Sequence, residues 1–232
     1  MISTRASFIQ KLSEVDKQLL RMGGIARGML VDSVSAFLGG DLLLIESIFL
    51  SDDIIDTLED EIELTCLRLL ALQQPMARDL RRVASAIKVA SEFERIGDQC
   101  VDIAKCARKI HTECFPSRPL IDVSRMSTVA EQMLDDSLSA FIHHDMDLIE
   151  QVCENDNIVD AEYKVGRNDL IAIGTRDSSM VAAAAYSLLV IGSIERIADH
   201  ATNIVERVAY LETGAFERLT RMHRSYLGEA PE

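Results

Sequence analysis

Tryptophan is absent from this 232-residue chain, and other residues typical of sheet-rich domains are scarce. Aromatic residues make up 5% of the chain, which contains 4 Pro and 11 Gly. Strands draw on aromatic and β-branched residues, and the many turns of a β-domain draw on Gly and Pro. Leu, Ile, Ala, Glu and Arg are abundant instead, and most of them favour helices. We therefore expect an all-α protein.

A long hydrophobic run is also missing. The longest uncharged stretch, residues 178–194, has 17 residues and contains Ser and Tyr. A membrane-spanning helix needs roughly 20 apolar residues, so we expect a buried core helix here. The first residues, "MISTRASFIQKLSEVDKQ", lack an apolar block followed by a small-residue cleavage site. This beginning does not resemble a secretory signal, and we expect a cytoplasmic protein.

Positive charge is scarce as well. The formal net charge is −14 at pH 7, with a pI near 4.8. Phosphate backbones and anionic lipids would repel such a chain, so we expect neither a nucleic-acid partner nor direct membrane binding. A cationic partner fits the charge better, and contact with a membrane would be peripheral, through partner proteins.

Cysteines and catalytic motifs give little support to a disulfide framework or an enzyme. The five Cys are odd in number and lie in helical patterns, which predicts reduced thiols. Their spacing matches no zinc motif. The chain contains no Walker motif and no Glu-x-x-His motif of the ferritin-like di-iron type, and no nucleophile and base can be paired from the sequence.

An internal repeat is the clearest pattern present. Residues 32–46, "DSVSAFLGGDLLLIE", align without gaps on residues 136–150, "DSLSAFIHHDMDLIE", with nine identities in fifteen. Further along, "EFERIGDQCVDIA" at 92–104 matches "SIERIADHATNIV" at 193–205 at an offset of 101. Such self-similarity predicts two copies of one structural unit of about a hundred residues.

Turn residues divide each repeat into three helices. "GGD" at 39–41 and "HHD" at 143–145 predict the first turn, with Asp41 and Asp145 as N-cap candidates. "QQP" at 73–75 and "GTRDSS" at 174–179 predict the second turn.

The third helix of the first repeat would run from about Met76 to His111. Each helix is amphipathic and needs neighbours to cover its apolar stripe, so we expect two tandem three-helix bundles with antiparallel packing. The prolines of "TECFPSRP" at 112–119 predict the linker. The expected organisation is a first bundle at 1–113, a second at 119–215 and a C-terminal tail at 216–232.

Carboxylates come level across each helical hairpin. Around Gln74, two aspartates lie 18 and 22 residues before the turn, and two acids lie 20 and 24 residues after it. The same count holds around Asp177 in the second repeat. The first set is Asp52, Asp56, Glu94 and Asp98, and the second set is Asp156, Asp160, Glu195 and Asp199.

These carboxylates share partly apolar helix faces, where they would repel one another and lose hydration. They need protonation, basic partners or a bound cation. Two interpretations stay open: a solvated acidic groove with ordinary ion pairs, or a metal site with oxygen ligands. The recurrence of the cluster in both repeats favours the metal site. Asp32, Asp136 and His200 are weaker candidates.

Residues 73–105 and 188–214 resemble the two motif-bearing helices of the PhoU family of phosphate-uptake regulators. The Pro-x-x-x-Asp-Leu-Arg start at Pro75, the Glu-Arg-Ile-Gly/Ala-Asp core and the duplication occur together, and the resemblance covers essentially the whole chain. It implies a fold of two similar three-helix bundles. It also implies a non-enzymatic cytoplasmic protein that lowers phosphate uptake and phosphate-regulon signalling.

The resemblance further implies partners and ligands. The partners would be the ATPase subunit of the phosphate ABC transporter and a membrane-bound sensor histidine kinase. Family members that bind metal use Glu/Asp-x-x-x-Asp pairs in multinuclear clusters, which correspond here to Glu94, Asp98, Glu195 and Asp199. The other four aspartates extend this set by hairpin geometry. Fe, Zn or Mn are favoured over Mg or Ca.

The repeats also differ from each other. Asp102 stands where the family has an Asn, as at Asn203, and it adds a carboxylate to the first site. The basic start of the third helix, with Arg78, Arg81 and Arg82, has no counterpart in the second repeat. We expect either a solvated helix start or a partner surface there, belonging to the first bundle only.

An alternative function is a carboxylate-bridged metalloenzyme on the same helical bundle, which requires an open coordination position and a pocket. A purely structural helical module with solvated acidic stripes is a third hypothesis. Long amphipathic helices with surplus apolar surface also make us expect a homodimer.

Overall fold

The computed structural model describes residues 4–113 and 119–215. All elements in these two segments are helices, which confirms the all-α prediction. In chain order they are α1 (Thr4–Gly39), α2 (Leu42–Gln73), α3 (Arg78–Thr112), α4 (Ser124–His143), α5 (Asp147–Arg176), a short 3₁₀ turn η1 (Ser178–Met180) and α6 (Val181–Thr213). The predicted tail at 216–232 and Cys114 lie outside the described residues.

The predicted turns separate the helices. α1 ends at Gly39, and Asp41 accepts a hydrogen bond from the backbone N–H of Leu43, 2.9 Å away, at the start of α2. Asp145 accepts the equivalent bond from Asp147 at 3.0 Å. Both aspartates satisfy a backbone donor that the first turn of a helix leaves without a partner.

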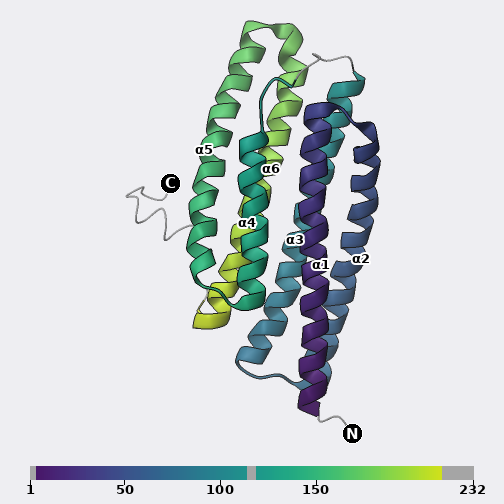
Figure 1. Ribbon diagram of the computed structural model, residues 1–232, viewed down its shortest axis with the longest axis vertical. Helices are drawn as coiled ribbons and strands as arrows, with labels where there is room; N and C mark the ends of the chain where they lie inside the picture. The colour runs from purple at the N-terminus through teal and green to yellow at the C-terminus, as the bar shows by residue number, and fades with distance from the viewer. Residues whose placement is uncertain (1–3, 114–118, 216–232) are drawn as a thin grey trace.

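The helices form two three-helix bundles, which lie side by side with all axes close to the long axis of the molecule (Figure 1). In the first bundle α1, α2 and α3 pack on one another, and in the second α4, α5 and α6 do so. The α2–α3 turn lies at one end of the molecule and the α5–α6 turn at the other, so the two bundles run in opposite directions (Figure 1).

The seam between the bundles is formed by α3 against α6 and by α1 against α4. A Cβ atom on Gly23 of α1 would lie only 2.5 Å from Leu138 Cδ2 of α4, so the two helices approach closely because Gly23 has no side chain. The core is continuous across this seam and includes the fully buried Phe37, Phe93 and Phe141.

The apolar stretch predicted to be a core helix lies in η1 and α6. Within the described residues, Ser178–Thr213 is the single candidate membrane span by length and composition, and 44% of its most apolar window is buried inside the molecule. α6 packs against α3, α4 and α5, as expected of a core helix.

Candidate metal centre and inter-bundle network

The first carboxylate cluster lies where α2 packs on α3. Gly97 of α3 makes room for Asp52 of α2: a Cβ atom at Gly97 would lie 3.1 Å from Asp52 Oδ1 and 3.3 Å from Ile55 Cδ1. The glycine of the Glu-Arg-Ile-Gly-Asp motif therefore allows a carboxylate to rest against the backbone of α3. In the second repeat the equivalent residue is Ala198.

Mutual repulsion shows that the first cluster is assembled as predicted. Burial, followed by the charges of Asp56, Asp98 and Asp53, raises the pKa of Asp52 to about 6, and Lys105 opposes the shift. Burial and then the charge of Asp98 also raise the pKa of Asp56 and of Glu94. Each carboxylate thus destabilises its neighbours when ionised.

Glu59 is a member of this cluster that the sequence analysis missed. Its pKa is raised by burial and by nearby carboxylates, against the effect of a hydrogen bond from Ser91. Its charge in turn raises the pKa of Glu94. The signal was available, because Glu59 follows Asp56 by three residues and so lies one helical turn along the same face. The equivalent residue in the second repeat is Tyr163.

The second cluster is smaller. Burial, followed by the charges of Asp199 and Asp160, raises the pKa of Glu195. Asp160 also lies 3.6 Å from Lys164 Nζ, one turn along α5. The charge of Asp156 acts on Cys153, whose thiol pKa is raised to about 11 mainly by burial. The structure thus brings Asp160, Glu195 and Asp199 together.

Asp102 has a different environment. Its Oδ1 accepts a hydrogen bond from Lys105 Nζ at 3.3 Å, and its charge raises the pKa of the Cys106 thiol, which burial raises most. The additional carboxylate of the first repeat is therefore paired with the base that also faces Asp52.

As placed, the side chains do not form a finished metal cage. Among residues 4–113 and 119–215, no three His, Cys, Asp or Glu side chains are grouped so that they could hold a metal ion. The donor chemistry nevertheless fits a cation, since several carboxylates with raised pKa values share one hairpin with a single lysine. Binding would require these side chains to rotate toward a common point.

His200 belongs to the seam and not to the second cluster. Its Nδ1 lies 2.7 Å from Glu92 Oε2 of α3, and Asn203 Nδ2 donates to the same oxygen at 3.1 Å. These contacts, with the charge of Arg207, lower the pKa of Glu92 although burial acts in the opposite direction. His200 and Asn203 therefore hold α6 to α3.

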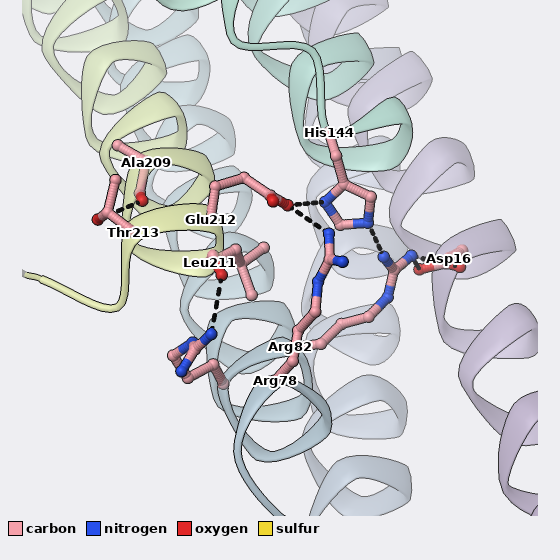
Figure 2. A network of polar contacts seen from close by, with 9 residues as sticks. Asp16, Arg78, Arg82, His144, Ala209, Leu211, Glu212 and Thr213 are labelled. Atoms are coloured by element: carbon pink, nitrogen blue, oxygen red, sulfur yellow. Dashed lines mark hydrogen bonds and ion pairs between the residues drawn. The ribbon is translucent and has the colours of Figure 1, made fainter.

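The basic start of α3 forms a second polar network between the bundles, which Figure 2 shows. Arg82 donates to both carboxylate oxygens of Asp16 on α1, at 2.9 and 3.0 Å, and also contacts His144 in the α4–α5 turn. Arg78 donates to Glu212 of α6 at 2.7 Å.

These contacts correct the sequence-based expectation for the start of α3. Arg82 is neither solvated nor free to face a partner, because its side chain is only 18% exposed and ion-paired within the chain. Arg81 likewise donates to the backbone carbonyl of Leu211, at 3.3 Å. The arginines lie on the first bundle only, but three of them bind elements of the second.

Comparison with known proteins places these features in a family. The PhoU domain model matches residues 19–107 and 123–208, one match in each bundle. A phosphate-specific transport system accessory protein PhoU homolog from Clostridium acetobutylicum is 37% identical over 212 residues, covering 91% of this chain and 96% of that protein. A homolog of the same name from Pseudomonas aeruginosa is 34% identical and covers 93% and 90%.

Solved structures agree. The crystal structure of PhoU from Pseudomonas aeruginosa superposes with a TM-score of 0.85 at 34% identity, covering 90% of this chain and all of that one. The phosphate transport system regulatory protein PhoU from Streptococcus pneumoniae gives a TM-score of 0.82 at 31% identity, with 91% and 100% covered. With two matches of the family model and similarity along nearly its whole length, the chain belongs to the PhoU family.

Proposed function

We propose that this protein is an accessory regulator of phosphate transport. The observation that supports this most directly is the similarity to proteins named for that role, at 37% identity over 91% of the chain. The shared architecture of two three-helix bundles agrees with it. In this proposal the protein lowers phosphate uptake and phosphate-regulon signalling from the cytoplasm and catalyses no reaction.

The proposed partners are the ATPase subunit of the phosphate ABC transporter and the phosphate sensor histidine kinase. Both would bring the protein to the membrane surface indirectly, as the net charge of −14 disfavours direct contact with anionic lipid. We further propose a homodimer, which light scattering on the purified protein tests.

Metal ions form part of the proposal. Asp52, Asp56, Glu94 and Asp98 would hold a cation between α2 and α3, and Glu195, Asp199 and Asp160 would do so between α5 and α6, with Asp156 and Asp102 nearby. The cation, with Fe, Zn or Mn favoured and multinuclear clusters expected, would neutralise repelling carboxylates and join the two helices of each hairpin. An ion that binds only the folded state adds stability by mass action.

The metalloenzyme alternative receives no support from the comparisons. The relatives are named accessory or regulatory proteins. Nothing in the two clusters pairs a base with a nucleophile, within the part of the chain that the structure describes.

The regulatory role is tested in a strain that lacks its own PhoU protein. We expect that deletion raises phosphate uptake and the expression of a phosphate-starvation reporter in phosphate-replete medium. Expression of this chain should restore both to the repressed level. Unchanged uptake and reporter expression on complementation, with the protein present in the cell, would contradict the proposal.

The metal sites are tested by elemental analysis of protein purified without chelators. We expect stoichiometric metal in the native protein and none in a variant with Glu94, Asp98, Glu195 and Asp199 changed to Ala. A matched control changes four exposed carboxylates away from the clusters, Glu113, Asp147, Glu154 and Asp169, to Ala and should retain metal. If the native protein stays metal-free after loading with Fe, Zn or Mn, the clusters are solvated acidic grooves.

A further inference from the structure

The outer side of α2 exposes large apolar side chains along its whole length. α2 packs only on α1 and α3, so one side faces away from the molecule. On that side Leu43 is 81% exposed, Leu50 67%, Leu64 49% and Leu72 77%. Apolar side chains that gather on an exposed face, as these do, are typical of surfaces that bind another molecule.

The second repeat shows that the fold does not require these leucines. α5 has the same position in its bundle as α2, and at an offset of 104 the buried residues of the two helices coincide, as in Ile45 and Ile149 or Ile55 and Val159. At the same offset the four leucines correspond to exposed polar residues: Asp147, Glu154, Asn168 and Arg176. The apolar surface is therefore specific to α2.

Negative charge surrounds the leucines. α2 contains eight acidic residues and one basic residue, Arg68. Asp53, Asp60 and Glu61 are exposed on the same helix as the leucines. The face thus combines apolar contact area with an acidic border, and its charge restricts what can cover it.

Charge excludes two candidate occupants. If a second copy packed its α2 antiparallel to this one, residues 52–63 of both chains would face each other, and seven of those twelve residues are acidic. An anionic lipid surface would be repelled in the same way. A segment with positive charge beside its apolar side chains meets neither penalty.

We propose that the outer face of α2 is a docking surface for an amphipathic helix of a partner protein, whose apolar stripe is flanked by Lys and Arg. The face consists of Leu43, Leu50, Ile54, Leu64, Leu67 and Leu72. Leu43, Leu50 and Ile54 recur at intervals of seven and four residues, so they form one stripe against which a helix can lie. The inference deepens the proposed function and rests on it for the existence of a partner.

The test uses the full-length protein and two synthetic 18-residue helical peptides, one of Leu and Lys and one of Leu and Glu, with leucines spaced to form one face. The swapped variant Leu43→Asp, Leu50→Glu, Leu64→Asn and Leu72→Arg gives α2 the residues of α5. The matched control, Val165→Glu and Leu189→Lys, gives the second bundle the exposed residues Glu61 and Lys88 of the first.

Fluorescence anisotropy should show that the native protein and the control bind the Leu/Lys peptide, that the swapped variant binds it at least tenfold more weakly, and that the Leu/Glu peptide binds the native protein at least tenfold more weakly. Thermal unfolding checks that the swapped variant is folded. Should it be unfolded, the double variant Leu50→Glu and Leu64→Asn, expected to weaken binding at least threefold, replaces it.

Several outcomes would overturn the inference. These are binding of neither peptide by the native protein, equal binding of both peptides, and undiminished Leu/Lys binding by the swapped variant. Light scattering that shows a dimer lost in the swapped variant would assign the face to a second copy. Cosedimentation with phosphatidylcholine vesicles, lost in that variant, would assign it to a membrane. Peptide binding reports on the face alone, and the reporter assay reports on the proposed function, so each can fail separately.

Discussion

At the scale of single residues, Asp52 shows how a helix pair can store electrostatic repulsion. Its carboxylate rests against the backbone of α3 at Gly97, near Asp56 and Asp98, and its pKa is raised to about 6 by burial and by those charges. At neutral pH the ionised group therefore opposes folding unless a cation is bound.

Replacement of Asp52 by Asn should remove this cost. The folded-state pKa of Asp52 lies above its value in an unfolded chain, so the folded protein binds the proton more tightly and becomes more stable as the pH falls through 6 toward 4. Without added metal, Asp52→Asn should be more stable than the native protein at pH 7, by on the order of 1 kcal/mol after solvent screening.

Urea denaturation at pH 7 and at pH 4.5 measures this difference, which should shrink at the lower pH because Asp52 is then largely protonated. Asp53→Asn is a suitable control, because Asp53 is exposed on the outer side of α2 and only a minor contributor to the shift. Parallel pH profiles for the native protein and Asp52→Asn would show that the carboxylate is well solvated.

At the scale of helices, the start of α3 is stabilised by residues of the other bundle. Arg82 joins Asp16 of α1 to His144 of the α4–α5 turn (Figure 2). His144 has a backbone φ of +58°, and the equivalent residue in the first repeat is Gly40, with φ +75°. A histidine in this conformation is uncommon, and here its side chain contacts Arg82 and lies 3.4 Å from Glu212.

Removal of the Arg82 side chain should therefore destabilise the protein. Arg82→Ala leaves the Asp16 carboxylate, only 22% exposed, without its bidentate partner, and we expect a loss of about 2 kcal/mol. Arg5→Ala is the matched control, because Arg5 is 63% exposed and pairs with Asp79 at the same end of the molecule. That variant should change the free energy of unfolding by less than about 0.5 kcal/mol. Equal effects of the two changes would show that the network adds no stability.

Helices and hairpin register were accessible from the sequence because they depend on local signals. Gly39, Asp41 and Pro75 marked turns, and the count of residues from each turn brought Asp56 level with Asp98. The partners of Arg82 were not accessible, since they depend on which face of α3 meets the other bundle. No spacing within one repeat contains that information.

At the scale of the whole molecule, the two bundles share one core across the seam. α3 and α6 each pack on both bundles, and Gly23 lets α1 approach α4 closely. The tandem arrangement followed from the repeat, but the opposite direction of the two bundles did not, because it is set by long-range packing of α3 on α6.

This shared core predicts cooperative unfolding. Hydrogen exchange measured by mass spectrometry in increasing urea should show the buried amides of α2 and α5 losing protection at the same urea concentration. Gly23→Val should lower that concentration for both helices together, because its side chain would collide with Leu138 across the seam. Loss of protection in one bundle well before the other would show that the bundles unfold independently.

The internal duplication also fixes the valence of the molecule. A homodimer of identical halves presents every surface twice, once per subunit. Here the halves are joined in one chain and have diverged, so that the leucine-rich flank of α2 occurs once and α5 presents charged residues in its place. Each chain can therefore engage one helix by this flank, in a one-to-one complex with a defined orientation.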